Sequence, residues 1–563
     1  MRQVGLIPSG AQQWFHRLCH GNSKFFLYCS TLAIYVHRTD DYSLDKVLTG
    51  FDTTFTHCVL SPHPGSQLVV TSSYDFVIRV WDLSSGDCVK SMNFPHKKSI
   101  GCIVWHPQDE DTVAVGLENG SLFLLNLQTA QSIEYNVGKS SFITCCSFNR
   151  GNPDLVLCGY KDGTTILYSL KSKKKMCRYK PPEKAGEVRA LEWDPLSDQF
   201  FLIGYSSGII CLCDSEREEF LNRLQDVGCD LGGLQWIQQQ PGDFLSYGRN
   251  SGVVRQWNVS KSSSTSSLSI RDAQLSDFEF LCGTELVVCS FQDGSVGVFN
   301  YKHKKMDFMT QPSHTETIFN CAFSAVEPNL LATSSYDRTV RLWDMSKMEC
   351  VDTLQGSTST IYSVSWSPDS LLVAGCTAKG EIFIWDAEST QVKLSVAMHS
   401  DLVYNVSWNS IERDTLASAS ADGACVVFRE NGEVLKRYSH PKAVFGVDWS
   451  ILKRSWLATG CFDGVVRVFD VTSSGKNAFV QLRGHTEAVY NVCWSPLVFG
   501  MLASGSNDRS IRVWHLSEHG TEQSVTVLRG HEHNVRALSW SHEIPFHLYS
   551  GGWDGSFRIW DVR

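Results

Sequence analysis

Two segments of the sequence carry the residue types of a serine hydrolase, in which Asp and His activate a Ser hydroxyl as a nucleophile. In both segments Ser stands two residues before Asp, and Asp stands six residues before Trp. The two sets are His314, Ser335, Asp337 and Trp343, and His485, Ser506, Asp508 and Trp514. Because the same set occurs twice at one spacing, we expect these side chains to satisfy polar groups buried between strands rather than to catalyse a reaction.

The cysteines show no metal-binding or disulfide pattern. The 20 Cys are scattered, with one Cys-x-Cys at Cys211 and Cys213, one adjacent pair at Cys145 and Cys146, and no Cys-x-x-Cys. The sequence also has no Gly-rich phosphate loop and no pair of carboxylates outside its turn aspartates. We therefore expect no catalytic residues, no metal, no cofactor and no small-molecule substrate.

The composition excludes several kinds of partner. The formal net charge of the 563 residues is −9 and only 19% of them are charged, which is not the basic excess of a nucleic-acid or membrane-surface binder. No stretch approaches the roughly 18 apolar residues that span a bilayer, and the N-terminal segment MRQVGLIPSG has no sustained apolar core. Scattered cysteines of this kind are typical of a reducing compartment. We expect an intracellular, cytoplasmic protein that neither binds nucleic acid nor inserts into a membrane.

A repeat of about 44 residues runs along the chain. The segment GHTEAVYNVCWSPLVFGMLASGSNDRSIRVWHL at residues 484–516 recurs as GHEHNVRALSWSHEIPFHLYSGGWDGSFRIWDV at residues 530–562. Each unit has short alternating apolar runs separated by turns, which predicts an antiparallel meander of strands. The aromatic or apolar residues ahead of the closing dipeptides are Trp81, Leu125, Tyr168, Cys213, Trp257, Phe299, Trp343, Trp385, Phe428, Phe469, Trp514 and Trp560.

This repeat resembles the WD-repeat family of β-propellers, in which each unit carries Gly-His near its start and Trp-Asp near its end. Gly-His stands at residues 484–485 and 530–531, and Trp-Asp stands at residues 81–82, 343–344, 385–386 and 560–561. The resemblance covers the chain from about residue 48 to residue 563. It implies an all-β protein of four-stranded blades.

The resemblance also implies a role for the two sets of His, Ser, Asp and Trp. In the family, such residues form a buried, hydrogen-bonded tetrad that ties together the strands of one blade. Other repeats depart from this pattern, and we expect their blades to be less rigid. The departures are Phe51 at the His position, Gly552 and Cys461 at Ser positions, and Lys379 at an Asp position.

Twelve repeats exceed the four to eight blades of one propeller, so we expect two tandem propellers. Residues 1–47 are predicted to form a degenerate first blade, with strands around Phe25–Cys29 and Leu32–His37 and an inner strand at Val4–Ile7. We place the domain boundary in the polar segment near residue 308. This gives an N-terminal propeller of seven degenerate blades over residues 1–307 and a C-terminal propeller over residues 308–563.

The C-terminal propeller is expected to lack a blade. It holds six repeats, and its last residues finish a third strand, whereas a following repeat would supply the outer strand. We expect a gap between the repeats around His314 and His531 rather than a tightened six-bladed ring. At closer range, ALEWDPLS, HPKAVFGVDWS and EIPFHLYSGGWDGSFRIWD resemble a subgroup of the family in which two propellers precede a long helical tail, which predicts a longer natural protein.

One position in each repeat is expected to line the mouth of the central channel. It lies four residues before the last aromatic residue of the innermost strand, and in the N-terminal propeller it holds mostly small residues, namely Thr56, Gly101, Thr144, Arg189 and Gly232. In the C-terminal propeller it holds Phe319, Tyr362, Tyr404, Phe445, Tyr490 and Arg536, and we expect Tyr336, Phe462 and Trp553 on the same face. Rings and Arg are typical of binding hot spots, although these rings could instead only pack against one another.

We expect a non-enzymatic scaffold that binds a peptide or partner domain on this face, in a multi-subunit transport complex. Arg or Lys side chains of a ligand could stack on the rings. The competing hypothesis is a substrate receptor of a cullin-four ubiquitin ligase, because the last repeat resembles the Trp-Asp-x-Arg motif by which such receptors dock the ligase adaptor. The residues of this motif are Arg558, Trp560, Asp561 and Arg563, of which the fold itself already requires Trp560 and Asp561.

Overall fold

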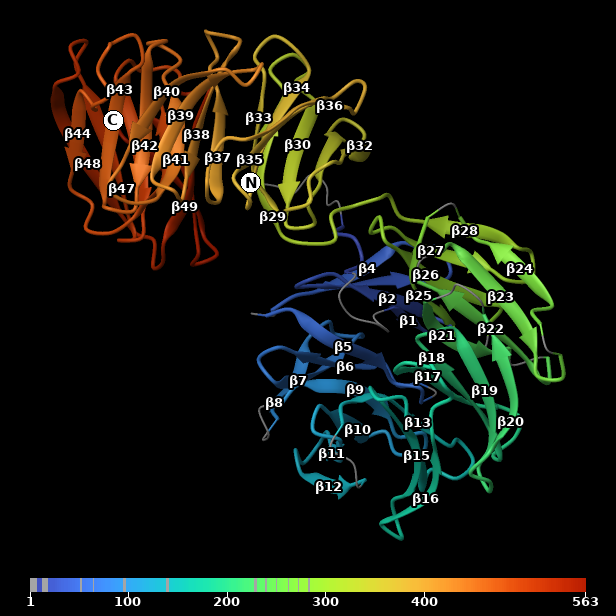
Figure 1. Cartoon of the computed structure of the whole chain (residues 1–563). Helices are drawn as coiled ribbons and strands as arrows, with labels where there is room; N and C mark the ends of the chain where they lie inside the picture. The colour runs from blue at the N-terminus through green and yellow to red at the C-terminus, as the bar shows by residue number, and fades with distance from the viewer. Residues whose placement is uncertain are drawn as a thin grey trace. The chain divides into compact units, whose positions relative to one another are not determined.

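The computed structural model describes residues 8–12, 19–50, 53–63, 65–94, 98–137, 141–226, 230–237, 240–249, 251–261, 263–271, 273–281 and 284–563. These residues form β-strands and turns without a helix, which confirms the predicted all-β class. They separate into two compact units, which we call the N-terminal unit (residues 8–315) and the C-terminal unit (residues 316–563). Figure 1 shows the strands of each unit arranged as the blades of a propeller.

The N-terminal unit consists of seven four-stranded antiparallel sheets, each built from four consecutive strands. The seven sheets are β1 (Cys19–Gly21), β2 (Phe25–Cys29), β3 (Ile34–Arg38) and β4 (Leu44–Leu48); β5 (Phe55–Leu60), β6 (Leu68–Ser73), β7 (Val77–Asp82) and β8 (Cys88–Asn93); β9 (Ile100–Trp105), β10 (Thr112–Leu117), β11 (Ser121–Asn126) and β12 (Ser132–Asn136); β13 (Ile143–Phe148), β14 (Leu155–Tyr160), β15 (Thr165–Ser169) and β16 (Lys174–Tyr179); β17 (Val188–Trp193), β18 (Phe200–Tyr205), β19 (Ile209–Asp214) and β20 (Phe220–Gln225); β21 (Leu231–Trp236), β22 (Asp243–Gly248), β23 (Val253–Asn258) and β24 (Ser266–Ser269); and β25 (Leu275–Phe280), β26 (Leu286–Phe291), β27 (Val296–Asn300) and β28 (Lys305–Met309).

The innermost strands of the N-terminal unit close a ring. Strands β1, β5, β9, β13, β17, β21 and β25 pack side by side in that order, and β25 packs in turn against β1. The backbone N–H of Cys19 on β1 donates to Oδ2 of Asp277 on β25 at 3.1 Å. The innermost strand of the first blade is therefore Cys19–Gly21; the predicted inner strand at Val4–Ile7 lies outside the described residues.

The C-terminal unit consists of five four-stranded sheets and one three-stranded sheet. The six sheets are β29 (Ile318–Phe323), β30 (Leu330–Ser335), β31 (Val340–Asp344) and β32 (Glu349–Leu354); β33 (Ile361–Trp366), β34 (Leu372–Thr377), β35 (Glu381–Asp386) and β36 (Val392–Ala397); β37 (Val403–Trp408), β38 (Thr415–Ser420), β39 (Ala424–Arg429) and β40 (Val434–Ser439); β41 (Val444–Trp449), β42 (Trp456–Cys461), β43 (Val465–Asp470) and β44 (Val480–Arg483); β45 (Val489–Trp494), β46 (Met501–Ser506), β47 (Ser510–Leu516) and β48 (Glu522–Arg529); and β49 (Val535–Trp540), β50 (His547–Gly552) and β51 (Phe557–Asp561).

The six sheets of the C-terminal unit form an open arc in the part of the chain that the structure describes. Innermost strands β29, β33, β37, β41, β45 and β49 pack in that order, but no comparable packing joins β49 to β29 among the described residues. Apolar side chains are exposed at both flanks, with Ile318 and Phe323 on β29 and Phe557 and Ile559 on β51. A tightened six-bladed ring would bury these side chains, so the described residues leave the ring open.

The polar segment chosen as the domain boundary forms a strand. The boundary between residues 307 and 308 falls inside β28, which pairs with β27 as the outer strand of the seventh sheet. The ring of Phe308 packs against Phe26 and Tyr42, with centroids 5.9 and 5.2 Å away. An outer strand exposes alternate residues to solvent, and β28 therefore has the composition of a linker although it belongs to the N-terminal unit.

Apolar side chains fill the space between adjacent sheets. A tryptophan closes many of the innermost strands, and in several of them its indole N–H donates to a carbonyl group of the preceding blade. Trp366 Nε1 donates to the Ala322 oxygen at 2.8 Å, and Trp540 Nε1 donates to the Cys493 oxygen at 2.9 Å. These bonds hold neighbouring innermost strands in register and so position their first residues, which lie at the opposite end of the channel.

Candidate functional site

The predicted rim residues of the C-terminal unit all occupy β-bulges. At the start of each innermost strand the pairing register shifts across one residue, which is left without a partner on the neighbouring strand. The unpaired residues are Phe319, Tyr362, Tyr404, Phe445, Tyr490 and Arg536. A bulge re-aims a side chain relative to the sheet, which explains why this position can face the channel mouth in every blade. We call the face at which the innermost strands begin the upper face.

Five of these residues form a continuous row of rings, which we call the aromatic crescent: Phe319, Tyr362, Tyr404, Phe445 and Tyr490. Consecutive ring centroids lie 4.7, 6.2, 4.5 and 4.9 Å apart. These separations are those of interacting aromatic pairs. The structure thus brings together side chains from five blades into one surface.

Three further rings extend the crescent outward, as the sequence predicted. Tyr336 lies 6.5 Å from Phe319, and Phe462 lies 6.1 Å from Phe445. Trp553 lies beyond the end of the crescent, where Arg536 Cζ is 4.5 Å from its centroid. The exposed fractions are 42% for Phe319, 46% for Tyr336, 49% for Phe462 and 68% for Trp553. Contact between the rings therefore leaves much of their surface open to solvent.

Arg536, at the bulge of the last blade, lies next to the end of the crescent and carries a charge. Its guanidinium carbon lies 3.5 Å from the centroid of Tyr490. Burial lowers the pKa of Arg536, against the opposing effect of Tyr490 and Tyr404. Beside Phe445, Lys442 Nζ lies 5.1 Å from the centroid of Phe462.

The corresponding bulges of the N-terminal unit hold mostly small residues instead of aromatic ones. Their residues include Thr56, Gly101, Thr144, Arg189 and Gly232. Two of the hydroxyl groups are engaged inside the unit, since Thr144 Oγ1 donates to the Val188 oxygen at 2.6 Å and Thr56 Oγ1 lies 2.6 Å from Ser72 Oγ. The aromatic row is therefore a property of the C-terminal unit.

The hydrogen-bonded tetrad contains Ser504 rather than the predicted Ser506. His485 Nδ1 lies 2.8 Å from Asp508 Oδ2, and its Nε2 lies 2.8 Å from Ser504 Oγ. Ser504 Oγ in turn accepts the indole N–H of Trp514 at 2.9 Å. Ser506 lies two residues farther along the same strand face, at its end, where its hydroxyl donates to the Glu487 oxygen and accepts from the Asp508 N–H.

The same correction applies to the other predicted set. Trp343 Nε1 donates to Thr333 Oγ1 at 2.8 Å, whereas Ser335 Oγ donates to the Glu316 oxygen at 3.2 Å. His314 is the penultimate residue of the N-terminal unit, where its carbonyl oxygen accepts from the Gly10 N–H at 2.9 Å. The hydroxyl that serves Trp thus stands four residues before Asp, not two.

With the hydroxyl four residues before Asp, two blades that were predicted to depart from the tetrad pattern do carry the hydroxyl. The last blade has a full tetrad, in which Ser550 Oγ lies 2.8 Å from both His531 Nε2 and Trp560 Nε1, and His531 Nδ1 lies 2.9 Å from Asp554 Oδ2. Gly552 and Cys461 are therefore not at the hydroxyl position, which belongs to Ser550 and Thr459. His440 Nε2 lies 2.9 Å from the Thr459 hydroxyl.

The blade with Lys379 has no tetrad. Gly375 stands where the hydroxyl would be, and Trp385 Nε1 donates to the Gln355 oxygen at 2.8 Å. Lys379 Nζ donates to Thr358 Oγ1 at 3.1 Å instead. The predicted departure at Phe51 lies outside the described residues.

The residues of the predicted ligase-adaptor motif lie on and just after β51. Arg558 Nε donates to Ser556 Oγ at 3.2 Å, and Trp560 belongs to the tetrad of its blade. Arg563 Nε donates to both carboxylate oxygens of Asp561, at 2.9 and 3.0 Å. Both arginines therefore already have partners within the last blade.

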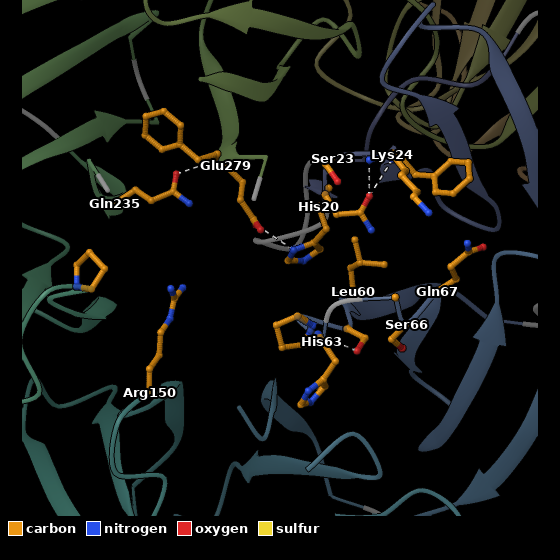
Figure 2. A pocket seen from close by; sticks show the side chains of 18 of the residues that line it. His20, Ser23, Lys24, Leu60, His63, Ser66, Gln67, Arg150, Gln235 and Glu279 are labelled. Carbon is orange, nitrogen blue, oxygen red and sulfur yellow. Dashed lines mark hydrogen bonds and ion pairs between the residues drawn. The ribbon is translucent and has the colours of Figure 1, made fainter. Parts of the chain in front are cut away.

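The N-terminal unit contains a cavity that the sequence did not predict. Its volume is about 380 Å³, and it lies where the innermost strands end, opposite the rim (Figure 2). His20 Nδ1 lies 2.9 Å from Glu279 Oε2 at its wall. Burial alone lowers the pKa of His20, but Glu279 outweighs it and raises this pKa to about 10. The two residues lie at opposite ends of the unit in sequence, and only closure of the ring by β1 brings them together.

The described part of the chain shows neither a group of three or more His, Cys, Asp or Glu placed to hold a metal ion nor a helix able to cross a bilayer.

Comparison with known families identifies the repeat. The model "WD domain, G-beta repeat" matches residues 44–82, 307–344, 348–386, 432–470, 476–515 and 522–561, and the model "Anaphase-promoting complex subunit 4 WD40 domain" matches residues 151–239. The match at residues 432–470, for example, begins just before β40 and ends with β43. Each matched repeat thus contains the outer strand of one blade and the three inner strands of the next, which is the register predicted from the sequence.

Several curated proteins are similar to this chain. Gem-associated protein 5 of Mus musculus is 27% identical over 374 residues, which cover 61% of this chain and 23% of that protein. Telomerase protein component 1 of Mus musculus is 24% identical over 406 residues, which cover 68% and 15%, and Dynein axonemal intermediate chain 4 of Rattus norvegicus is 20% identical over 372 residues, which cover 63% and 43%. The chain spans about a quarter of the length of the first of these relatives.

Proposed function

Because this chain is built from WD repeats, we propose that it is a non-enzymatic scaffold whose C-terminal unit binds a peptide or a partner domain at the aromatic crescent. The observation that supports this proposal is the uninterrupted row of half-buried rings, each supplied by a bulge of a different blade. Large aromatic side chains that are clustered and still accessible are the residues most often found to dominate binding energy.

Packing alone does not account for these rings. Rings that served only to fill the channel mouth would be buried by one another, yet Tyr336, Phe462 and Trp553 remain about half or more exposed. Exposed apolar clusters on one face are characteristic of interaction surfaces. The crescent and the three rings that flank it together have this character, and Lys442 and Arg536 add charge at two points.

The hydrolase-like residue sets support a structural role. Ser504 is completely buried, and its Oγ lies between His485 Nε2 and the indole N–H of Trp514. A hydroxyl held in this way cannot reach a substrate. The sets therefore serve the blades, and we assign no catalytic residue.

The relatives extend the proposal to membership of an assembly. Their names contain the words associated protein, component and intermediate chain, and we propose that this chain likewise is a subunit of a multi-subunit transport complex. The closer resemblance noted in the sequence is to WD repeat-containing protein 17, and we propose the same arrangement of two propellers followed by a helical tail for the natural protein.

Affinity capture followed by mass spectrometry tests the proposal. The bait is the whole chain, and the variant combines Tyr404→Ala, Phe445→Ala and Tyr490→Ala. The matched control combines Val392→Ala, Val434→Ala and Leu435→Ala, which removes exposed apolar side chains from outer strands of the same unit.

We expect the crescent variant to lose partners that the control retains, with circular dichroism unchanged in both. The proposal is wrong if the folded crescent variant captures every partner of the parent protein, or if the control loses the same partners.

A further inference from the structure

Arg536 is a part-buried arginine of the rim without a counter-ion among the described residues, unlike Arg467 and Arg189. Arg467 pairs with Asp463 at 2.6 Å. Arg189 occupies the equivalent bulge of the N-terminal unit, and it pairs with Glu187 at 2.7 Å. No carboxylate of the described residues lies within ion-pair distance of Arg536. An unpaired guanidinium in a half-buried position is unusual, because removing a charge from water without compensation costs free energy.

Two rings contact the guanidinium group of Arg536, whereas its N–H groups donate to no described residue. Its Cζ lies 3.5 Å from the centroid of Tyr490 and 4.5 Å from that of Trp553. Stacking on rings engages the flat face, whereas the N–H groups point outward in the plane and match a carboxylate in bidentate geometry. The Nε atom is buried and donates to no described group. Stacking on the two rings thus fixes the orientation of the guanidinium group, while its N–H donors have no acceptor among the described residues.

Two acidic side chains of the upper face, Asp401 and Glu487, have partners of their own. Asp401 Oδ1 accepts from the Leu402 N–H at 2.7 Å, and Glu487 accepts from the side-chain amide of Asn507. Neither pairs with Arg536. A carboxylate for Arg536 must therefore come from outside the described residues.

We propose that Arg536 is the receptor for an acidic side chain of the bound partner, so that the crescent recognises a peptide segment in which Asp or Glu adjoins apolar or aromatic residues. This inference rests on the proposed function, because it assigns the chemistry of the partner at the same surface. The carboxylate pairs with the edge of Arg536, and the adjoining side chains lie on Tyr490 and the rings beyond it. Pairing compensates a charge that the free protein leaves unpaired, which favours acidic segments over neutral or basic ones.

The continuity of the crescent favours an extended peptide over a free anion. Arg536 follows Tyr490 at the end of the row, so a segment lying along the row meets the rings and the guanidinium in succession. A small anion would satisfy only Arg536. A basic segment would place like charges together at Arg536 and Lys442.

A phage library of random 12-residue peptides, selected on the whole chain, tests this inference. Peptides that bind the parent protein but not the Tyr404→Ala, Phe445→Ala, Tyr490→Ala variant are synthesised, and their Kd values are measured by fluorescence polarisation. We expect a recurrent Asp or Glu in these peptides. Changing it to Asn or Gln should weaken binding to the parent protein by about tenfold or more, as for loss of a charged hydrogen bond.

The same change in the peptide should have little effect on binding to the Arg536→Gln variant, and Arg189→Gln should leave all affinities unchanged. Crescent-dependent peptides that lack a recurrent acid, or that tolerate the amide, would overturn this inference and leave the proposed function intact. If no peptide depends on the crescent, both are wrong. Because the amide-bearing peptide is measured on the unmodified protein, the outcome does not depend on the folding of Arg536→Gln.

Discussion

The hydroxyl of Ser504 accepts the indole N–H of Trp514 at 2.9 Å and lies 2.8 Å from Nε2 of His485, so one oxygen joins two strands and the loop before them. Replacing it leaves a buried indole N–H without an acceptor. We expect Ser504→Ala to lower the free energy of unfolding by about 1–3 kcal/mol. Urea denaturation of the whole chain measures the change.

Ser504→Thr should be close to neutral, because Thr333 accepts from Trp343 at the same position of another blade. Equal losses for the Ala and Thr variants would show that packing, not the hydroxyl, matters at this site.

Asp508 should contribute to stability in a way that Lys379, at the same position of another blade, does not. Asp508 accepts from His485 Nδ1 at 2.8 Å and from Ser510 Oγ at 2.6 Å. We expect Asp508→Ala to cost about 1–3 kcal/mol at neutral pH and Lys379→Ala far less, since Lys379 bonds only to an exposed hydroxyl. Similar losses in urea melts of the two variants would contradict the assigned register.

The contribution of Asp508 should also depend on pH. Burial alone raises the pKa of Asp508, but the hydrogen bonds from His485 and Ser510 outweigh it and hold this pKa well below its usual range. A carboxyl group with a depressed pKa stabilises the fold above its unfolded pKa, about 4, and loses this effect as the pH falls. The stability difference between the parent protein and Asp508→Asn should therefore shrink below about pH 4.

Tyr490 and Arg536 should stabilise one another. With the guanidinium carbon 3.5 Å from the ring centroid, we expect a coupling energy of about 0.5–2 kcal/mol in a double-mutant cycle of Tyr490→Leu and Arg536→Met. Lys442 and Phe462, which are 5.1 Å apart, provide a matched pair that should couple less. Strict additivity for the Tyr490 and Arg536 variants would mean that the two side chains do not interact in solution.

The N-terminal unit should become less stable as the pH rises above about 6.5. The pKa of His20 is raised to about 10 by Glu279, although burial opposes the charge. A histidine with a raised pKa stabilises the fold fully below its unfolded pKa, about 6.5, and loses this effect as the pH rises through the folded value. The advantage of the parent protein over Glu279→Gln in urea melts should therefore decline between pH 6.5 and 10. A constant difference across this range would exclude a charged His20.

The repeat period made both the fold and the rim positions predictable. The spacing of the anchor residues determines which residue begins each innermost strand, and the structure places every predicted rim residue of the C-terminal unit at a bulge. The spacing of residues could not identify the tetrad hydroxyl where two serines lie on the same face of one strand. Ser504 and Ser506 both precede Asp508 on β46, and only the depth of the His485 ring between the strands decides which of them it meets.

The contacts that close the ring of the N-terminal unit were also not predictable from the sequence. The innermost strand of the first blade is three residues long, Cys19–Gly21, and it is held by pairing with β2 and by the hydrogen bond to Asp277 rather than marked by apolar alternation. The pair of His20 and Glu279 follows from the same closure. The outer strand β28 was equally hidden, because a strand at the edge of a sheet can be polar without losing its pairing.

The bulged residues of the rim do not take part in the strand pairing of their blades. A bulged residue has no partner across the ladder, so exchanging its side chain leaves the strand pairing on either side intact. Each blade of the C-terminal unit therefore has one position whose side chain can change without loss of a ladder pair. The small residues of one unit and the rings of the other show that one residue per blade is enough to give two domains of a single chain different surfaces at the channel mouth.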